Sequence, residues 1–199
     1  MSRELRREAL QAFCDALDAV APDAPTLCEG WDAHDLAVHL WVITHDPLSW
    51  PGEFLPITPL RRLTRRRARR LRTERPYSAL VAALRAGSGA IACMPGDERL
   101  EGCRHAIGEY FVHTQDIVRA NGIEQRPPAL ELENALWRRL GVATPVLKWR
   151  DHPGLLLTRP DGLTAQATRG RPRTRVSGSP SELMCWVYGR PADVCVERL

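Results

Sequence analysis

The first 150 residues repeat apolar side chains at intervals of three or four positions, a pattern typical of amphipathic helices. In residues 2–20, Leu5, Leu10, Phe13 and Leu17 fall on one side of the predicted helix. The same periodicity predicts four further helices, over residues 32–46, 77–91, 104–120 and 131–147. This part of the chain is therefore predicted to be a helical bundle.

Capping and breaking residues mark the ends of several predicted helices. Asp32 is suited to cap the second helix, and Pro47 biases Asp46 out of helical geometry. Asn121 and Gly122 follow the fourth helix, where a left-handed C-terminal cap is expected. The predicted ends thus have local chemical causes.

The pattern changes after residue 153. Residues 154–170 contain two strand-like runs separated by Pro160-Asp161-Gly162, which is the composition of a hairpin turn. A third strand is expected at residues 174–178, a short helix at 179–188 and a last strand at 192–199. The predicted fold class is α+β, with a helical bundle over residues 1–150 and a small mixed α/β unit over residues 151–199.

Composition indicates a globular protein and gives no membrane signal. The chain has 199 residues, 44% hydrophobic and 26% charged. No apolar run approaches the roughly 18 residues that a transmembrane helix needs. The N-terminus lacks the apolar region of a secretory signal, so a cytoplasmic protein is expected. The six cysteines are at least ten residues apart, so free thiols are expected rather than disulfides, with Cys28 the thiol nearest to a candidate site.

Nine arginines between residues 61 and 75 concentrate positive charge in one segment. Leu60, Leu63 and Leu71 recur there near helical spacing, which predicts an amphipathic helix or lid with a solvated basic face. It follows a proline-rich loop at residues 47–59. No aromatic platform or known DNA-binding module accompanies it, so a nucleic-acid partner is not expected. The alternative role for this segment is a basic wall that attracts a small anionic substrate toward the site.

Three side chains form the main candidate site. Glu109 and His113 are four residues apart and therefore project from one face of the fourth helix. His39 lies in the second helix, so packing of the two helices would bring it to the same place. A carboxylate and two imidazoles suit zinc and leave a coordination position for a thiol, water or substrate. A plain surface pair and a buried, hydrogen-bonded histidine are the alternatives.

Three segments together resemble the mycothiol-dependent maleylpyruvate isomerase-like family, part of the wider group of DinB-like metal-binding four-helix bundles. They are TLCEGWDAHDLAVHL, EYFVHTQDIVRA and SGSPSELMCWVYGRPADV. The resemblance implies a DinB-like four-helix bundle with a divalent metal, commonly zinc, held by one histidine of the second helix and a glutamate and a histidine of the fourth. By position these ligands are His39, Glu109 and His113. It further implies mycothiol as a thiol cofactor whose thiolate adds to the substrate.

Other residues near these motifs are secondary candidates. Asp116 could accept a hydrogen bond from a ligand imidazole, or could instead pair with Arg119. His105 is expected to be solvated or to support a ligand, because it lies about 12 Å along the helix from His113. His34 and His45 should face away from His39, and His152 carries no motif. A substrate-binding arginine is not assigned, with candidates at Arg159, Arg169, Arg171, Arg173 and Arg175.

The leading functional hypothesis is a zinc-dependent transferase or isomerase that uses a thiol cofactor such as mycothiol on a small electrophilic metabolite. Its expected partners are a small-molecule thiol and that substrate, with no membrane. No catalytic side chain is assigned. The alternatives are a metal-binding protein that sequesters a ligand or regulates a partner without turnover, and a metal-dependent hydrolase that would need Asp116 or His105 as a base.

Overall fold

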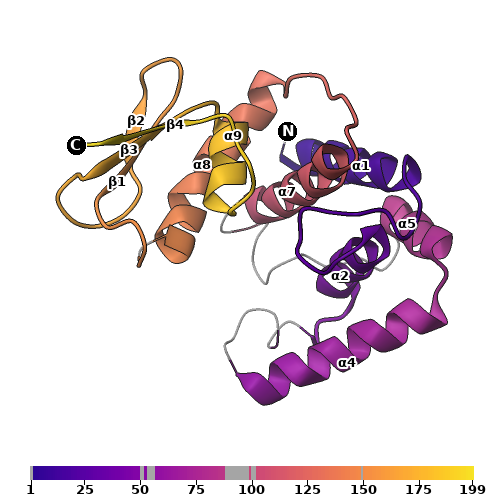
Figure 1. The fold of residues 1–199 in the computed structure, drawn as a ribbon. Helices are drawn as coiled ribbons and strands as arrows, with labels where there is room; N and C mark the ends of the chain where they lie inside the picture. The colour runs from indigo at the N-terminus through magenta and orange to yellow at the C-terminus, as the bar shows by residue number, and fades with distance from the viewer. Residues whose placement is uncertain (1, 50–51, 53–56, 88–98, 100–101, 149) are drawn as a thin grey trace. The chain divides into compact units, whose positions relative to one another are not determined.

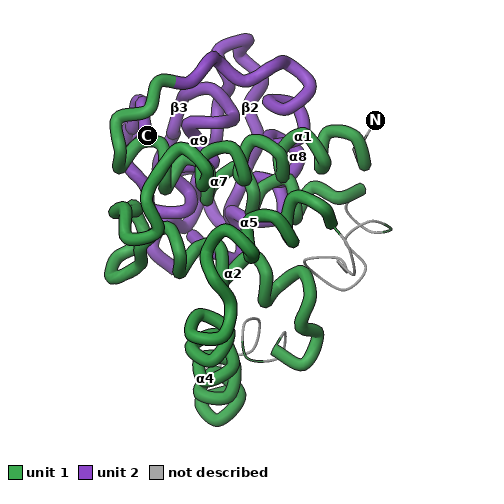
Figure 2. The backbone as a smooth tube through the Cα atoms, turned by 90° about the vertical axis from the view of Figure 1, so that its right-hand side faces the viewer, with its two compact units in different colours: residues 1–124 green, residues 125–199 purple. Residues whose placement is uncertain are grey.

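A computed structural model of the chain describes residues 2–49, 52, 57–87, 99, 102–148 and 150–199. Their contacts divide the chain into two compact units, Met1–Glu124 and Gln125–Leu199 (Figure 2). The expected boundary was at residue 150, but helix α8 (Leu130–Lys148) packs against α9 (Pro180–Val187) in the second unit. The first unit is therefore shorter than the helical segment expected from sequence.

The first unit is built from helices (Figure 1). Its described helices of eight or more residues are α1 (Ser2–Asp18), α2 (Ala33–His45), α4 (Thr58–Glu74), α5 (Tyr77–Ala86) and α7 (Arg104–Ala120). Helix α1 packs against α7 and α5, and α2 packs against α5 and α4. Most side chains of α7 are buried, so this helix is the centre of the unit. Leu17, Leu36 and Ile117 are among the fully buried core residues.

Several predicted helix ends are confirmed by their caps. The Asp32 side chain accepts a hydrogen bond from the Asp35 backbone N–H, and the Asp35 side chain accepts one from the Asp32 backbone N–H, forming a capping box at the start of α2. Gly122 follows α7 with φ +63°, the left-handed conformation expected there. Helix α5 ends at a left-handed Gly87, earlier than expected, and residues 88–91 of the predicted helix lie outside the described residues.

The arginine-rich segment is a helix, as predicted, but its apolar stripe is not the main attachment. Leu63 is 49% exposed, and the buried side chain of α4 is the polar Thr64. Arg67 instead forms an ion pair with Asp46 at 2.6 Å. Charge and hydrogen bonding therefore fix a helix whose sequence is too polar to be held by burial. Most of the loop predicted at residues 47–59 lies outside the described residues.

The second unit combines α8 and α9 with a four-stranded sheet. The sheet order is β2 (Thr164–Gln166), β1 (Leu155–Thr158), β3 (Thr174–Ser177) and β4 (Cys195–Arg198). Strands β1 and β2 form the predicted hairpin, β1 and β3 are parallel, and β3 and β4 are antiparallel. A helical N-terminal region followed by a small mixed sheet confirms the predicted α+β class.

Two expectations from composition can be compared with the described residues. None of the described helices is both long and apolar enough to span a membrane. The described cysteines are all free thiols, as predicted: Cys14, Cys28, Cys103, Cys185 and Cys195. Cys93 lies outside the described residues. Burial raises the pKa of the Cys14 thiol to about 12, so this thiol stays protonated.

Candidate metal centre

Helices α2 and α7 bring the three predicted ligands together. One nitrogen each of His39 and His113 and one carboxylate oxygen of Glu109 lie within 4.8 Å of one another. Glu109 Oε2 is 3.7 Å from His113 Nε2, and the ring centroids of His39 and His113 are 5.1 Å apart. The predicted convergence of these residues is therefore present in the folded chain.

Local packing explains why His39 points to this place. Leu36 and Leu40 on α2 are fully buried, and His39 lies between them in sequence on the inner side of the helix. On α7, Glu109 and His113 are one turn apart and therefore share a face. The apolar pattern that buries this side of α2 and the one-turn spacing on α7 thus both position the ligand atoms.

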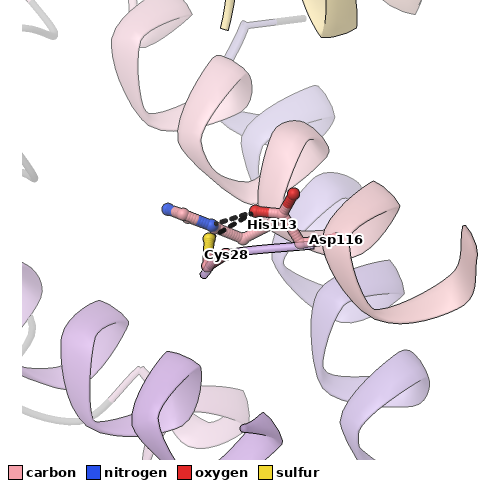
Figure 3. A group of neighbouring side chains, drawn as sticks. All are labelled: Cys28, His113 and Asp116. Carbon is pink, nitrogen blue, oxygen red and sulfur yellow. Dashed lines mark hydrogen bonds and ion pairs between the residues drawn. The ribbon is translucent and has the colours of Figure 1, made fainter. Parts of the chain in front are cut away.

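The ring of His113 is held from its other side. Its Nδ1 lies 2.8 Å from Asp116 Oδ2, and Asp116 is fully buried (Figure 3). Nε2 is left on the side of Glu109. This is the arrangement in which a carboxylate fixes the orientation of a histidine ligand, and it is one of the two roles considered for Asp116 from the sequence.

Cys28 adds a thiol to the same cluster. Its Sγ donates a hydrogen bond to Asp116 Oδ2 at 3.1 Å, although the two residues are 88 positions apart (Figure 3). The backbone N–H of Leu27 donates to the Asp116 carbonyl at 3.0 Å and so ties this loop to α7. Cys28, His113 and Asp116 are a second group with metal-ligand chemistry, sharing His113 with the first.

The electrostatic environment prepares two of the three predicted ligands. Burial, assisted by the charge of His113, lowers the pKa of His39 to about 4, so its imidazole is neutral at pH 7. Burial alone would raise the pKa of Glu109, but the hydrogen bond from His113 and the electrostatic interactions with the neighbouring histidine rings outweigh this and lower it to about 2. The pair therefore offers a neutral nitrogen lone pair and a carboxylate.

His113 behaves differently from His39. Burial opposes its protonation, but its interactions with Asp116, Cys28 and Glu109 are stronger and raise its pKa well above the ordinary value. Its Nδ1 faces the carboxylate of Asp116 and its Nε2 that of Glu109, which favours the protonated ring. A metal ion at Nε2 would take the place of a proton there.

The donor set fits a tetrahedral ion. Zinc bonds to nitrogen and oxygen of about 2.0–2.2 Å place neighbouring ligand atoms roughly 3.4 Å apart. The 3.7 Å between Glu109 and His113 is close to this, and small side-chain rotations would bring in His39. The ring nitrogens of His39 form no hydrogen bond with the part of the chain that the structure describes. A neutral imidazole with available nitrogens, beside an anionic carboxylate, is what the ion requires.

The other histidines lie apart from this cluster, with one exception. His34 contacts Tyr77 edge-on, and His45 stacks on Trp41, so both face away from His39 as expected. His105 is only 6% exposed, so of the two roles expected for it the solvated one is excluded. Its electrostatic interaction with Glu109, one turn further along α7, helps to lower the pKa of that carboxyl group.

The arginines considered for substrate binding all lie in the second unit. Arg159 donates to Asn134 and pairs with Asp161, and Arg175 pairs with Glu197. Arg169, Arg171 and Arg173 are exposed. Assignment of any of them to a substrate stays a prediction.

Sequence reasoning missed a cavity beside His39. It has a volume of about 460 Å³ and lies between α2 and α4, with His39 and Trp31 in its wall. The Trp31 and His39 rings are 5.3 Å apart. The run WDAHDLAVH within the first of the three quoted segments was a signal, because Trp31, Asp35 and His39 all line the cavity. The opposite wall is formed by α4 and could not be predicted, because it depends on how α4 packs against α2.

Two solved structures are similar to this chain over nearly its whole length. One is a histidine-to-alanine variant of the mycothiol-dependent maleylpyruvate isomerase, with a TM-score of 0.65 and 19% identity. The other is that isomerase without the substitution, with a TM-score of 0.61 and 16% identity. Each match covers 98% of this chain and 91% of the other.

No protein-family model matches the sequence, and no curated protein matches it significantly. At this level of identity the structural similarity shows the fold. This chain thus has the fold of the mycothiol-dependent maleylpyruvate isomerase, which confirms the fold expected from the sequence motifs. The chemistry has to be argued from the residues themselves.

Proposed function

We propose that this protein binds a zinc ion through His39, Glu109 and His113 and is a transferase or isomerase that uses a thiol cofactor on a small electrophilic metabolite. The observation that carries the proposal is the convergence of these three donor atoms within 4.8 Å. The fold shared with an enzyme described as mycothiol-dependent supports mycothiol as the thiol. Zinc is favoured because two imidazoles and one carboxylate suit it.

The chain's own residues perform distinct tasks in this proposal. His39 is neutral and Glu109 ionised, so neither must change its charge to bind a divalent cation. Asp116 accepts a hydrogen bond from His113 Nδ1, so that Nε2 is the nitrogen directed to the ion. Three protein ligands leave one position open for a small molecule.

When bound, zinc would lower the pKa of a coordinated thiol, so that a thiolate forms near neutral pH without a protein base. A mechanism without a protein base is consistent with this chain, because the carboxylate of Asp116 already accepts hydrogen bonds from other side chains. Asp116 is fully buried and receives hydrogen bonds from His113 and Cys28. It is therefore badly placed as the general base that a metal-dependent hydrolase needs.

The metal is tested by elemental analysis of the purified wild type and of the His39→Ala and His113→Ala variants. We expect about one zinc per chain in the wild type and a large loss in both variants. His34→Ala is the matched control, because His34 lies on the same helix and contacts Tyr77 instead. Equal metal in all four proteins would refute the ligand assignment.

The thiol is tested separately by thermal unfolding with mycothiol. We expect it to raise Tm for the zinc-loaded wild type and to leave the His39→Ala variant unchanged. No shift in the zinc-loaded protein would refute thiol-cofactor use. Turnover assays with electrophilic substrates and mycothiol then separate an enzyme from a metal protein that only sequesters a ligand.

A further inference from the structure

The cavity between α2 and α4 has two chemically different sides. On α2, Asp35, Val38, His39 and Val42 recur at helical spacing and form one wall. Trp31, 40% exposed, extends this wall beyond the start of the helix. One side thus combines three apolar side chains with the Asp35 carboxylate and a predicted metal ligand.

The opposite wall is a row of arginines on α4. Arg61, Arg65 and Arg69 line the cavity at intervals of four residues, spanning about 12 Å along the helix. Within the described residues, none of the three has a carboxylate partner. Three like charges on one helix face repel one another, and a concave surface strengthens their combined field.

The fourth arginine of the wall has a structural task. Arg72 binds Asp32 and Asp35, each at 2.7 Å, which fixes the end of α4 against the start of α2. Nearer the start of α4, the Thr64 hydroxyl donates a hydrogen bond to the Ser49 carbonyl at 2.9 Å. Figure 1 shows α4 lying beside α2 in the orientation that these contacts fix. The spacing between the arginine row and His39 is therefore held from both ends.

We infer that this cavity binds an elongated small molecule that carries at least two phosphate or carboxylate groups on an apolar body. Guanidinium groups bind either kind of oxyanion in the same bidentate way. The apolar residues of α2 and the Trp31 ring would contact the body, and one end would lie at His39. The inference depends on the proposed function in one respect: the bound molecule is taken to be the substrate that reacts at the metal ion.

Charge alone does not single out the arginines of the cavity. Arg62 and Arg66 lie on the same helix, are exposed and also lack a carboxylate partner among the described residues, but they do not line the cavity. The double variant Arg62→Gln/Arg66→Gln therefore matches Arg65→Gln/Arg69→Gln in helix, residue type and charge removed. Comparing the two double variants distinguishes binding in the cavity from nonspecific electrostatic attraction to a positively charged helix.

The test is calorimetric titration of the full chain with suberate and hexane-1,6-diol bisphosphate, and with octanoate as a singly charged compound of similar length. We expect at least one doubly ended probe to bind, with octanoate at least ~10-fold weaker. Arg65→Gln/Arg69→Gln should weaken that binding by ~10-fold or more, and Arg62→Gln/Arg66→Gln by less than ~3-fold. Whichever of suberate and the bisphosphate binds more tightly shows whether the cavity prefers carboxylate or phosphate groups.

Three results would overturn the inference: no binding of either doubly ended probe, equal weakening by the two double variants, or tighter binding of a duplex oligonucleotide that depends equally on both arginine pairs. The metal is kept separate by repeating the titration with Glu109→Gln, since Glu109 does not line the cavity. If the wild-type protein binds the probes but contains no zinc, the proposed function is refuted and the assignment of the cavity as an anion-binding site is retained.

Discussion

His113 and Asp116 form a buried hydrogen bond of 2.8 Å between Nδ1 and Oδ2, one turn apart on α7. This contact decides which nitrogen of His113 faces Glu109 and His39. It also joins the metal-ligand group to the loop that carries Cys28, because the thiol donates to the same oxygen. The carboxylate is thus central to the candidate site without belonging to the predicted ligand triad.

Asp116→Asn should weaken zinc binding by about 10–100-fold, the usual cost of losing a carboxylate that orients a histidine ligand. The amide has nearly the same shape but no charge to balance the metal-bound imidazole. The measurement is zinc affinity by competition with a chromophoric chelator. Circular dichroism of the variant checks that α7 is still folded. An unchanged affinity would mean that the hydrogen bond serves packing alone.

Cys28→Ala distinguishes the two groups of candidate ligands that share His113. We expect the variant to retain about one zinc per chain, because its thiol hydrogen-bonds Asp116 and is not one of the three ligands we assign. Glu109→Gln, in contrast, should lose most of the metal. Elemental analysis after dialysis measures both. The reverse result would place the ion among Cys28, His113 and Asp116.

Asp46→Asn should lower the free energy of unfolding by about 1 kcal/mol at pH 7. It removes an ion pair between a nearly buried carboxylate and the Arg67 side chain, which is 41% exposed, so solvent screening limits the contribution. Denaturant unfolding measures the difference from the wild type. Glu74→Gln, which breaks the more exposed pair with Arg70, is the control and should change stability by less than about 0.5 kcal/mol.

The Asp46 pair should also depend on pH in a defined direction. Partial burial opposes the shift, but hydrogen bonds from Arg67 and Ser49 outweigh it and lower the pKa of Asp46 in the folded protein. Its stabilisation is therefore fully present above the unfolded pKa of about 3.9 and is lost as pH falls through the lower folded value. The difference between wild type and Asp46→Asn should thus be constant from pH 5 to 7 and shrink below about pH 4. If the difference in unfolding free energy between wild type and Asp46→Asn persists at the lowest pH, it arises from packing and not from the charge of Asp46.

Glu133→Gln should destabilise the second unit by about 1–2 kcal/mol. The carboxylate on α8 accepts hydrogen bonds from the Ser181 backbone N–H at 2.8 Å and from its hydroxyl at 2.7 Å, at the start of α9. A negative charge there also interacts favourably with the helix dipole. Chemical unfolding measures the change. Glu131→Gln, exposed on the same helix, is the control and should have little effect.

Most helices and strands followed from the sequence because their signals are local. The periodicity of the segment from about Arg104 to Ala120 predicted α7, and the Pro160-Asp161-Gly162 turn predicted the hairpin of β1 and β2. The attachment of α4 was not predictable in this way. Its ion pairs join residues between 21 and 40 positions apart, and an arginine-rich pattern does not show which arginines meet a carboxylate.

The sequence by itself determined which residues could form a metal site, since the spacing of Glu109 and His113 places both on one face of any helix containing them. Only the tertiary structure decided that His39 meets them, that Asp116 binds His113 while Cys28 binds Asp116, and that arginines of α4 face His39 across a cavity. The physical reason is range. Helix periodicity and capping act over a few residues, whereas these contacts join segments that approach one another only through the packing of separate helices and loops.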